Sequence, residues 1–269
     1  MPLPGQLSVQ INSEALQRVA AGLRAVGPPL ANRAEVALPA LDRSLVAGLP
    51  VFQGLTPEQQ DDVLGEAQSV RYPKGADVFQ QDQEAQHFFL LLHGHLRVYR
   101  LTPDGQQVVV RYISPGEIFG VAMALGRTTY PANAAAVVDS VALVWPNAVW
   151  PRLSEAYPAL LANTLRTVGS RLQDAQTRVV EMSTEQVERR IAHALLRLAQ
   201  QSGRKVETGI QIDFPISRQD VAEMTGATLH TVSRVLSAWE DRGLVESGRQ
   251  KITLRDPHRI FALAEGNGG

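Results

Sequence analysis

Residues 217–243 read SRQDVAEMTGATLHTVSRVLSAWEDRG, a stretch with two helix starts separated by one glycine. Ser217, with Asp220 three residues later, forms a capping box that predicts the start of a short helix. Gly226 then ends that helix, and Thr228 caps a second one. Two short helices across a glycine turn are typical of a helix-turn-helix, whose second helix enters the major groove of DNA.

The second helix is predicted from Leu229 to Asp241, with a buried face made by Val232, Val235, Leu236 and Trp239. After Gly243, residues 244–254 predict two short strands around the turn Ser247-Gly248-Arg249-Gln250, the hairpin called a wing. Hydroxyl, imidazole and guanidinium groups suit contacts with base edges and phosphates, and Arg234 suits a bidentate contact with guanine. The predicted DNA-binding residues are Arg218, Thr228, Leu229, His230, Thr231, Ser233, Arg234, Arg249 and Lys251.

A helical hairpin with a solvated charged face is the alternative interpretation of this stretch. Residues 217–259 hold seven basic and six acidic side chains, so net charge does not decide between the two. The capping residues, the turn and the wing together favour DNA binding.

A long helix is predicted upstream, from Pro158 to Met182. Its apolar residues follow spacings of 4, 3, 4, 3, 4 and 3, which is an uninterrupted a/d seam. Such a seam is typical of a coiled coil, so we expect two copies to pair along it, and one helix of a monomeric bundle is the alternative. The seam residues are Leu161, Leu165, Val168, Leu172, Ala175, Val179 and Met182.

One more helix and one strand are predicted between these two helical regions. Ser183, with Gln186 three residues later, predicts a capping box that opens a further helix running to about Gln201. The alternating residues 210–214 then predict a strand before Pro215.

The region from about residue 45 to 150 predicts β-structure after one short helix, which Thr56-Pro57-Glu58 opens. Turn signals separate short β-branched and aromatic runs, and Thr102-Pro103-Asp104-Gly105 predicts a hairpin between residues 95–101 and 106–113. Short strands at this spacing indicate an antiparallel sandwich or small barrel.

Composition limits the function classes. The 269 residues include 26 basic and 27 acidic side chains, so the near-neutral charge identifies no partner. There is no cysteine, which excludes cysteine-ligated iron–sulfur clusters and thiolate zinc sites. No signal peptide or membrane-spanning run is visible, so a cytoplasmic protein is expected. Residues 1–43 are expected to be a poorly ordered extension with one short helix over 13–26.

The chain resembles the CRP/FNR superfamily of bacterial transcription regulators from Leu45 to Ala264. The resemblance rests on GHLRVYRLTPDGQQVVVRYISPGEIFG at 94–120, on the long helix, and on ISRQDVAEMTGATLHTVSRVLSAWEDRGLVESG at 216–248. It implies a homodimer that binds a palindromic operator, with RNA polymerase as a further partner. Many relatives have Glu at the position of His230, which leaves the base preference beside Arg234 open.

The resemblance implies an α+β fold. An extension at 1–43 precedes a cyclic-nucleotide-binding-like β-roll (a double-stranded β-helix) at 44–150, which would sense an effector. A dimerisation helix follows at 151–182, and a winged helix-turn-helix occupies 183–264.

The effector is expected to contact the segment after residue 118. The family's cyclic AMP site has an acid where this chain has Val121, and an Arg–Ser pair where it has Pro131 and Ala132, so cyclic AMP is not expected. AMALGRTTYPANAAAV at 122–137, with TLHTVSR at 228–234, is similar to the nitric-oxide-responsive regulators of denitrification. The effector-pocket residues are Phe119, Gly120, Met123, Arg127, Tyr130, Pro131, Ala132 and Asn133.

That branch implies haem, for which His87, His93 and His95 are the candidate axial ligands, although a His beside a β-turn is more often a surface residue. A regulator with another effector, or with none, is the alternative. His93-Gly94-His95 has the spacing of a cupin metal site, but no acid follows within six residues and no further His occurs between His95 and His193. A metal enzyme is therefore not expected.

Overall fold

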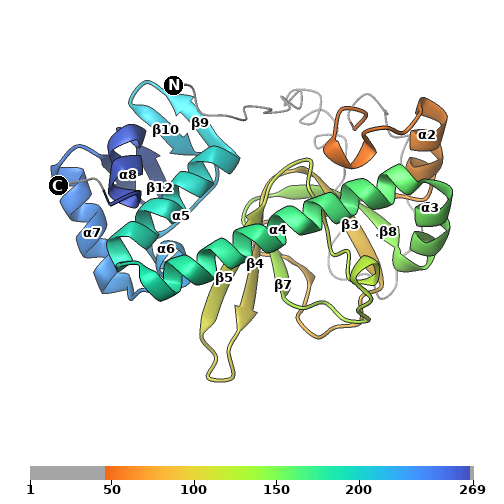
Figure 1. Cartoon of the computed structure of the whole chain (residues 1–269), viewed down its shortest axis with the longest axis horizontal. Coiled ribbons are helices and arrows are strands. Elements are labelled where there is room, and N and C mark those ends of the chain that lie inside the picture. The colour runs from red at the N-terminus through yellow and green to blue at the C-terminus, as the bar shows by residue number, and fades with distance from the viewer. Residues whose placement is uncertain (1–45, 267–269) are drawn as a thin grey trace. The chain divides into compact units, whose positions relative to one another are not determined.

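The structure, a computed structural model, describes residues 46–266 (Figure 1). The expected extension at 1–43 and its helix lie outside the described residues. The chain divides into two compact units. Among the described residues, one unit comprises 46–96 together with Ile113–Gly169, and the other comprises Arg97–Tyr112 together with 170–266.

The first unit opens with a short 3-10 helix, η2 (Pro50–Phe52), and with α2 (Pro57–Gly65). Thr56 caps α2 as predicted: its hydroxyl accepts from the Gln59 backbone N–H, and the Gln59 side chain accepts from the Thr56 backbone N–H. The capping box satisfies two backbone donors that have no partner within the helix.

Antiparallel strands follow, as the turn signals predict. The order of the main sheet is β1-β8-β3-β6, formed by β1 (Gln68–Tyr72), β8 (Ser140–Pro146), β3 (His87–His93) and β6 (Ile118–Phe119). In the same unit, β2 (Asp77–Phe79) pairs with β7 (Asn133–Ala136). A short 3-10 turn, η3 (Met123–Leu125), lies between β6 and β7.

The core of this unit is aromatic and aliphatic. Phe88 on β3 stacks on Trp145 of β8 with ring centroids 5.2 Å apart, and Trp150 meets Phe88 edge-on at 5.3 Å. The buried Trp145 indole N–H donates to the Val63 carbonyl at 2.7 Å, so its polar atom is satisfied. This contact fixes α2 against the sheet.

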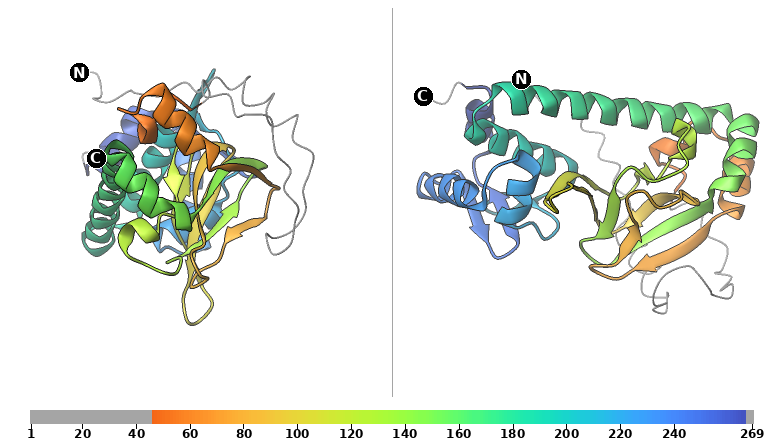
Figure 2. Two further views of the ribbon diagram at one scale, coloured as in Figure 1. Left: turned by 90° about the vertical axis from the view of Figure 1, so that its right-hand side faces the viewer. Right: turned by 90° about the horizontal axis from the view of Figure 1, so that it is seen from below.

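The short helices η4 (Asn147–Val149) and α3 (Trp150–Ala156) lead into α4 (Pro158–Thr184), which Figure 2 shows as one continuous helix. The predicted long helix is confirmed and is two residues longer than expected. Leu160, Asn163 and Thr164 are its buried residues near the start. The Asn163 amide donates to the carbonyls of Val51 and Gln53, which anchors the first turns of α4.

The predicted capping box at Ser183 is wrong. Ser183 and Thr184 lie inside α4, where their hydroxyls donate to the carbonyls of Val179 and Val180, four residues earlier. The next helix, α5 (Val187–Ser202), begins after Gln186, whose side chain makes no capping hydrogen bond. Hydroxyls already bonded within one helix do not cap the next.

The second unit contains all but the two outermost residues of the hairpin of β4 (Leu96–Leu101) and β5 (Gln107–Ile113), whose turn is as predicted. Its own sheet has the order β11-β12-β10-β9. The strands are β9 (Gly203–Val206), β10 (Gly209–Ile212), β11 (Val245–Gly248) and β12 (Lys251–Leu254). The strand expected at 210–214 is β10, which ends two residues earlier, and β9 was not predicted.

Helices α5, α6 (Arg218–Thr225), α7 (Leu229–Asp241) and α8 (Pro257–Ala264) complete this unit. In the part of the chain that the structure describes, no helix is both long and apolar enough to cross a membrane.

Candidate nucleic-acid interface and effector segment

The first helix of the predicted helix-turn-helix, α6, is held at its start by the capping box. The Ser217 hydroxyl accepts from the Asp220 backbone N–H at 3.1 Å, and the Asp220 carboxylate accepts from the Ser217 backbone N–H at 2.8 Å. Gly226 ends the helix with φ +62°, a left-handed conformation that favours glycine. The predicted helix start and turn are confirmed.

The second helix, α7, starts where Thr228 accepts from the Thr231 backbone N–H at 3.1 Å. Val232, Leu236 and Trp239 are fully buried, as predicted, and Val235 is half-buried. The Trp239 indole N–H donates to Glu188 on α5 at 2.8 Å. The buried face of α7 thus fixes which of its residues remain at the surface.

The residues predicted to read DNA lie at that surface. Thr228, Leu229, His230 and Arg234 are exposed, whereas Thr231 and Ser233 are half-buried. Leu229 is a large apolar side chain with 47% of its surface exposed. A helix start that presents hydroxyl, imidazole, guanidinium and apolar groups together can contact both phosphates and base edges.

The wing is a tight hairpin in which Gly248 of β11 pairs with Lys251 of β12. The two residues of its turn are Arg249 and Gln250, and Gln250 adopts φ +57°. Arg249 and Lys251 are exposed, so both cations are available to phosphates.

Arg218 differs from the predicted arrangement. Its guanidinium forms an ion pair with Glu240 at 3.2 Å and donates to the Ser247 hydroxyl at 2.8 Å. Glu240 in turn accepts from the Ser247 backbone N–H at 2.8 Å. Arg218 thus links α6, the end of α7 and the wing, and its charge is already balanced within the protein. Sequence reasoning missed Glu240 and Ser247, which no local motif marks.

The predicted effector-pocket residues divide into two groups. Phe119, Tyr130, Ala132 and Asn133 are buried, and Gly120 is half-buried. The exposed members are Met123, Arg127 and Pro131. Ala124, beside the exposed members, packs against the same core as Leu161 and Val168 of α4. The segment and the start of α4 thus pack against one shared core of the first unit.

The buried members join an aromatic cluster. Phe79 stacks on Tyr130 with centroids 3.9 Å apart, and Phe89 stacks on Phe119 at 5.0 Å. Phe79 also lies 5.7 Å from Phe89, so the four rings form one continuous group. These rings contact one another directly.

His87 is the candidate haem ligand that the structure brings to this segment. The Tyr130 hydroxyl donates to the His87 carbonyl at 2.7 Å and accepts from its backbone N–H at 3.1 Å. Burial lowers the pKa of His87, which keeps its imidazole neutral, as a metal ligand must be. Its ring centroid lies 6.3 Å from that of Phe89, so a donor of suitable chemistry borders the aromatic cluster.

His93 and His95 lie at the other end of β3 and in the turn that follows. The Ser140 backbone forms the neighbouring surface: a Cβ at Gly94, between the two histidines, would lie 2.7 Å from the Ser140 Cα. The structure thus places this H-x-H turn against the start of β8. Within residues 46–266, no cluster of three or more His, Asp or Glu side chains is arranged to hold a metal ion.

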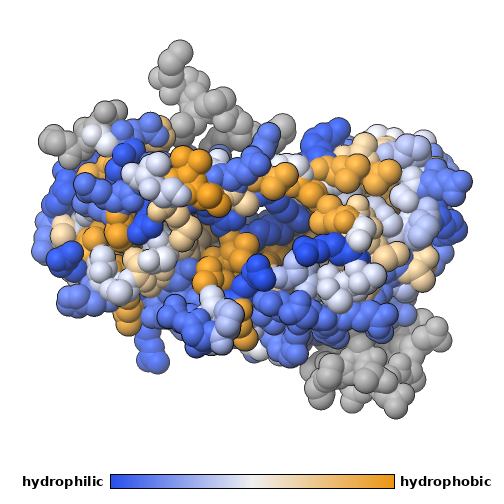
Figure 3. All heavy atoms as spheres, turned by 60° about the horizontal axis from the view of Figure 1, so that its bottom comes forward, coloured by the Kyte–Doolittle hydropathy of each residue, from blue (hydrophilic) through white to orange (hydrophobic). Residues whose placement is uncertain are grey.

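The seam of α4 is mostly at the surface of the single chain. Leu165, Leu172, Val179 and Met182 expose 45%, 59%, 64% and 46% of their surface. Ala175 is half-buried, and Leu161 and Val168 are half-buried against the core of the first unit. Figure 3 shows apolar side chains at the surface on one face of the molecule. Large apolar residues repeated along one helix are typical of a face that a partner covers.

Two family models match the chain. One, described as "Cyclic nucleotide-binding domain", matches residues 69–157, and the other, "Crp-like helix-turn-helix domain", matches residues 189–263. Both matches agree with the predicted β-roll and helix-turn-helix.

The similar proteins are transcription regulators. The "Cyclic AMP receptor protein" of Thermus thermophilus is 31% identical over 81% of this chain and 98% of its own length. The "Nitrogen fixation regulation protein FixK" of Bradyrhizobium diazoefficiens is 29% identical over 72% of this chain and 81% of its own. Both are named as receptor or regulation proteins, which agrees with the expectation that this chain is not an enzyme.

Solved structures agree on the fold. FixK2 from Bradyrhizobium japonicum matches with a TM-score of 0.66 at 23% identity, over 73% of this chain and 96% of that one. A CRP-family transcriptional regulator from Thermus thermophilus matches with a TM-score of 0.63 at 25% identity, over the same shares.

Proposed function

Because this chain belongs to the CRP/FNR family of transcription regulators, with an effector-binding domain and a DNA-binding helix-turn-helix, we propose that two copies pair along α4 and bind a palindromic operator. The observation that carries the pairing is the exposed apolar seam of α4, from Leu165 to Met182. Water contact at these side chains is unfavourable, and a second copy of the same helix offers a matching apolar surface.

Two exposed surfaces of the second unit, the wing and the start of α7, have different parts in operator recognition. Arg249 and Lys251 on the wing neutralise phosphates, which makes affinity fall as salt rises. Arg234 on α7 reads a guanine, a contact that contributes of order 1–3 kcal/mol of discrimination in each half-site. Paired helix-turn-helix units place their half-sites about one helical turn apart.

The pairing and the operator are tested together. Selection from a random duplex library is expected to enrich two inverted half-sites, and light scattering is expected to give the mass of two chains. A single, unrepeated motif bound by a monomer would contradict the proposal.

For the effector, we propose a diatomic gas such as nitric oxide, bound through haem at the β-roll. His87 would hold the haem, since it is half-buried and borders the aromatic cluster of Phe79, Phe89, Phe119 and Tyr130, and burial lowers its pKa and so favours the neutral imidazole. When bound, haem supplies an iron that takes diatomic gases. The protein's part would be to fix the His87 backbone through its two hydrogen bonds with the Tyr130 hydroxyl and to keep apolar rings beside it. Cyclic AMP is disfavoured because residues 119–133 contain no acid for the ribose hydroxyl.

An anaerobic haem titration tests this assignment. A saturable Soret band at one haem per chain, shifted by nitric oxide and lost in His87→Ala, is the expected result. His258→Ala, an exposed histidine on α8, is the matched control. Weak, non-saturating binding, or a band that His87→Ala leaves unchanged, would contradict it.

A regulator with another effector, or with none, is the second candidate. The close packing of the aromatic cluster favours it, because its ring centroids lie 3.9 to 6.2 Å apart and the rings already pack against one another. Unchanged thermal stability in the presence of haem would support this candidate. RNA polymerase is proposed as the further partner in either case.

A further inference from the structure

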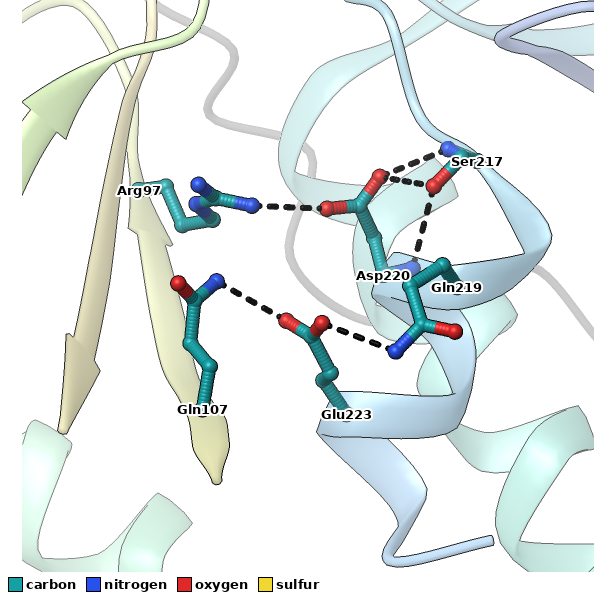
Figure 4. A network of polar contacts seen from close by, with 6 residues as sticks. All are labelled: Arg97, Gln107, Ser217, Gln219, Asp220 and Glu223. Atoms are coloured by element: carbon teal, nitrogen blue, oxygen red, sulfur yellow. Dashed lines mark hydrogen bonds and ion pairs between the residues drawn. The ribbon is translucent and has the colours of Figure 1, made fainter. Parts of the chain in front are cut away.

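The β4–β5 hairpin contacts the first helix of the helix-turn-helix through two polar pairs. Arg97 on β4 lies 3.1 Å from the Asp220 carboxylate of α6, with 28% and 16% of the two side chains exposed. The Gln107 amide on β5 donates to Glu223 of α6 at 2.9 Å. Figure 4 shows both side chains extending from the hairpin toward α6.

The Asp220 carboxylate has two roles. Oδ1 accepts from Arg97, while Oδ2 accepts from the Ser217 backbone N–H and so completes the capping box. Glu223 is shared in the same way, because it also accepts from Gln219 at 3.0 Å. The groups that hold the hairpin therefore also hold the first turn of α6 (Figure 4).

The hairpin is anchored beside these pairs as well. The Tyr112 ring lies 4.6 Å from that of Phe214, just before α6, and both residues are buried. The Gln201 amide of α5 donates to the Tyr112 carbonyl at 3.2 Å, and the Arg178 guanidinium of α4 donates to the Val110 carbonyl. The hairpin thus contacts α4, α5 and the segment just before α6. These contacts fix the strands that carry Arg97 and Gln107.

We propose that Arg97 and Gln107 are positioning residues for DNA binding: they fix α6 through Asp220 and Glu223, and α6 in turn sets α7 across the Gly226 turn. Arg97 and Asp220 are 123 residues apart, so a residue outside the helix-turn-helix determines operator affinity without touching DNA. The inference rests on the proposed operator binding.

The test is operator affinity in a double-mutant cycle, with a duplex selected by the wild-type chain as the probe. Asp220→Asn removes the charge and keeps an acceptor for the Ser217 cap. Arg97→Ala is expected to weaken binding roughly five-fold, about 1 kcal/mol, and to make Asp220→Asn nearly silent when the two are combined. Arg97→Lys restores a charge and is expected to recover part of the affinity.

Two matched controls lie in the same hairpin. Arg100→Ala removes an equal charge from an exposed position of β4, and Gln106→Ala removes an exposed amide beside Gln107. Both are expected to bind as the wild type does. Because Arg97 touches no phosphate, the slope of log affinity against log salt should be the same for Arg97→Ala and the wild type.

Three results would overturn the inference. These are equal or tighter operator binding by Arg97→Ala, additive effects of Arg97→Ala and Asp220→Asn, and a salt slope reduced by about two, which marks a direct phosphate contact in each half-site. A purely structural pair would lower the unfolding temperature and leave the affinity of the folded protein unchanged. A wild-type chain that does not distinguish the selected duplex from random DNA would overturn the proposed operator binding and this inference with it.

Discussion

The Arg218 guanidinium lies 3.2 Å from the Glu240 carboxylate, and this ion pair joins the first residue of α6 to the last turn of α7. Glu240 also holds the wing through the Ser247 backbone N–H. A side chain that sequence reasoning assigns to DNA phosphates is thus engaged in assembling the DNA-binding surface. A salt titration distinguishes contact with phosphate from assembly of the protein surface, because only a phosphate contact contributes to the slope of log affinity against log salt.

Arg218→Ala is expected to weaken operator binding without changing its salt dependence, because the lost contacts are internal. Arg249→Ala, at the exposed wing turn, is expected to lower the salt slope by about two, because the dimer loses one phosphate contact in each half-site. The measurement is affinity over a range of salt concentrations. Equal slope changes in the two variants would show that Arg218 binds phosphate directly.

Arg234→Ala is expected to abolish most of the difference between operator and random DNA. The lost guanine contact is of order 1–3 kcal/mol per half-site, whereas phosphate contacts remain. Gel-shift competition between the two duplexes measures it. Arg242→Ala, an exposed arginine just after α7, is the control and should keep the preference. Retained preference in Arg234→Ala would contradict the assignment.

Leu172→Glu is expected to convert dimers to monomers, because it places a charge in the middle of the proposed seam. Leu172 is 59% exposed in the single chain, so the substitution leaves the monomer's own packing intact. Light scattering measures the mass. Gln173→Glu introduces the same side chain at the next, exposed position and should remain dimeric. A dimeric Leu172→Glu would exclude this face as the interface.

Gly120→Ala is expected to destabilise the β-roll by about 1–3 kcal/mol, since its Cβ would lie 2.7 Å from the Phe89 ring. Gly126→Ala is a close control, because Gly126 has the same φ of +67° and nothing within 4 Å of an added Cβ. The difference between the two unfolding temperatures isolates the ring contact from backbone strain. Equal destabilisation would show that the Phe89 ring shifts to accommodate the added methyl group without a further loss of stability.

The helix-turn-helix was predictable because its signals are local. Ser217, Gly226 and Thr228 act within three or four residues of their own positions, so their types and spacing are sufficient. The long helix was predictable for a similar reason, since its heptad spacing is a property of consecutive turns. The same reasoning failed at Ser183, because a Ser or Thr hydroxyl can equally bond a carbonyl within a continuing helix.

The remaining features depend on residues that are distant in the sequence. Arg218 meets Ser247 across 29 positions, and Tyr130 meets the His87 backbone across 43. The sequence marks neither partner, because the tertiary fold alone brings them together. The aromatic cluster could not be predicted for the same reason, since Phe79, Phe89 and Tyr130 come from three separate segments of the sequence.

The path of the chain also limits how this regulator can be divided. The second compact unit takes Arg97–Tyr112 from the middle of the sequence, so a fragment that starts at Ser170 would lack the hairpin. Phe214 would lose the Tyr112 ring, and Asp220 would lose Arg97. Chimeras that graft the DNA-binding half onto another sensor must carry that hairpin with them. The two units are therefore interleaved along the sequence, and a single crossover near Ser170 would remove the hairpin from the contacts it makes with Phe214 and α6.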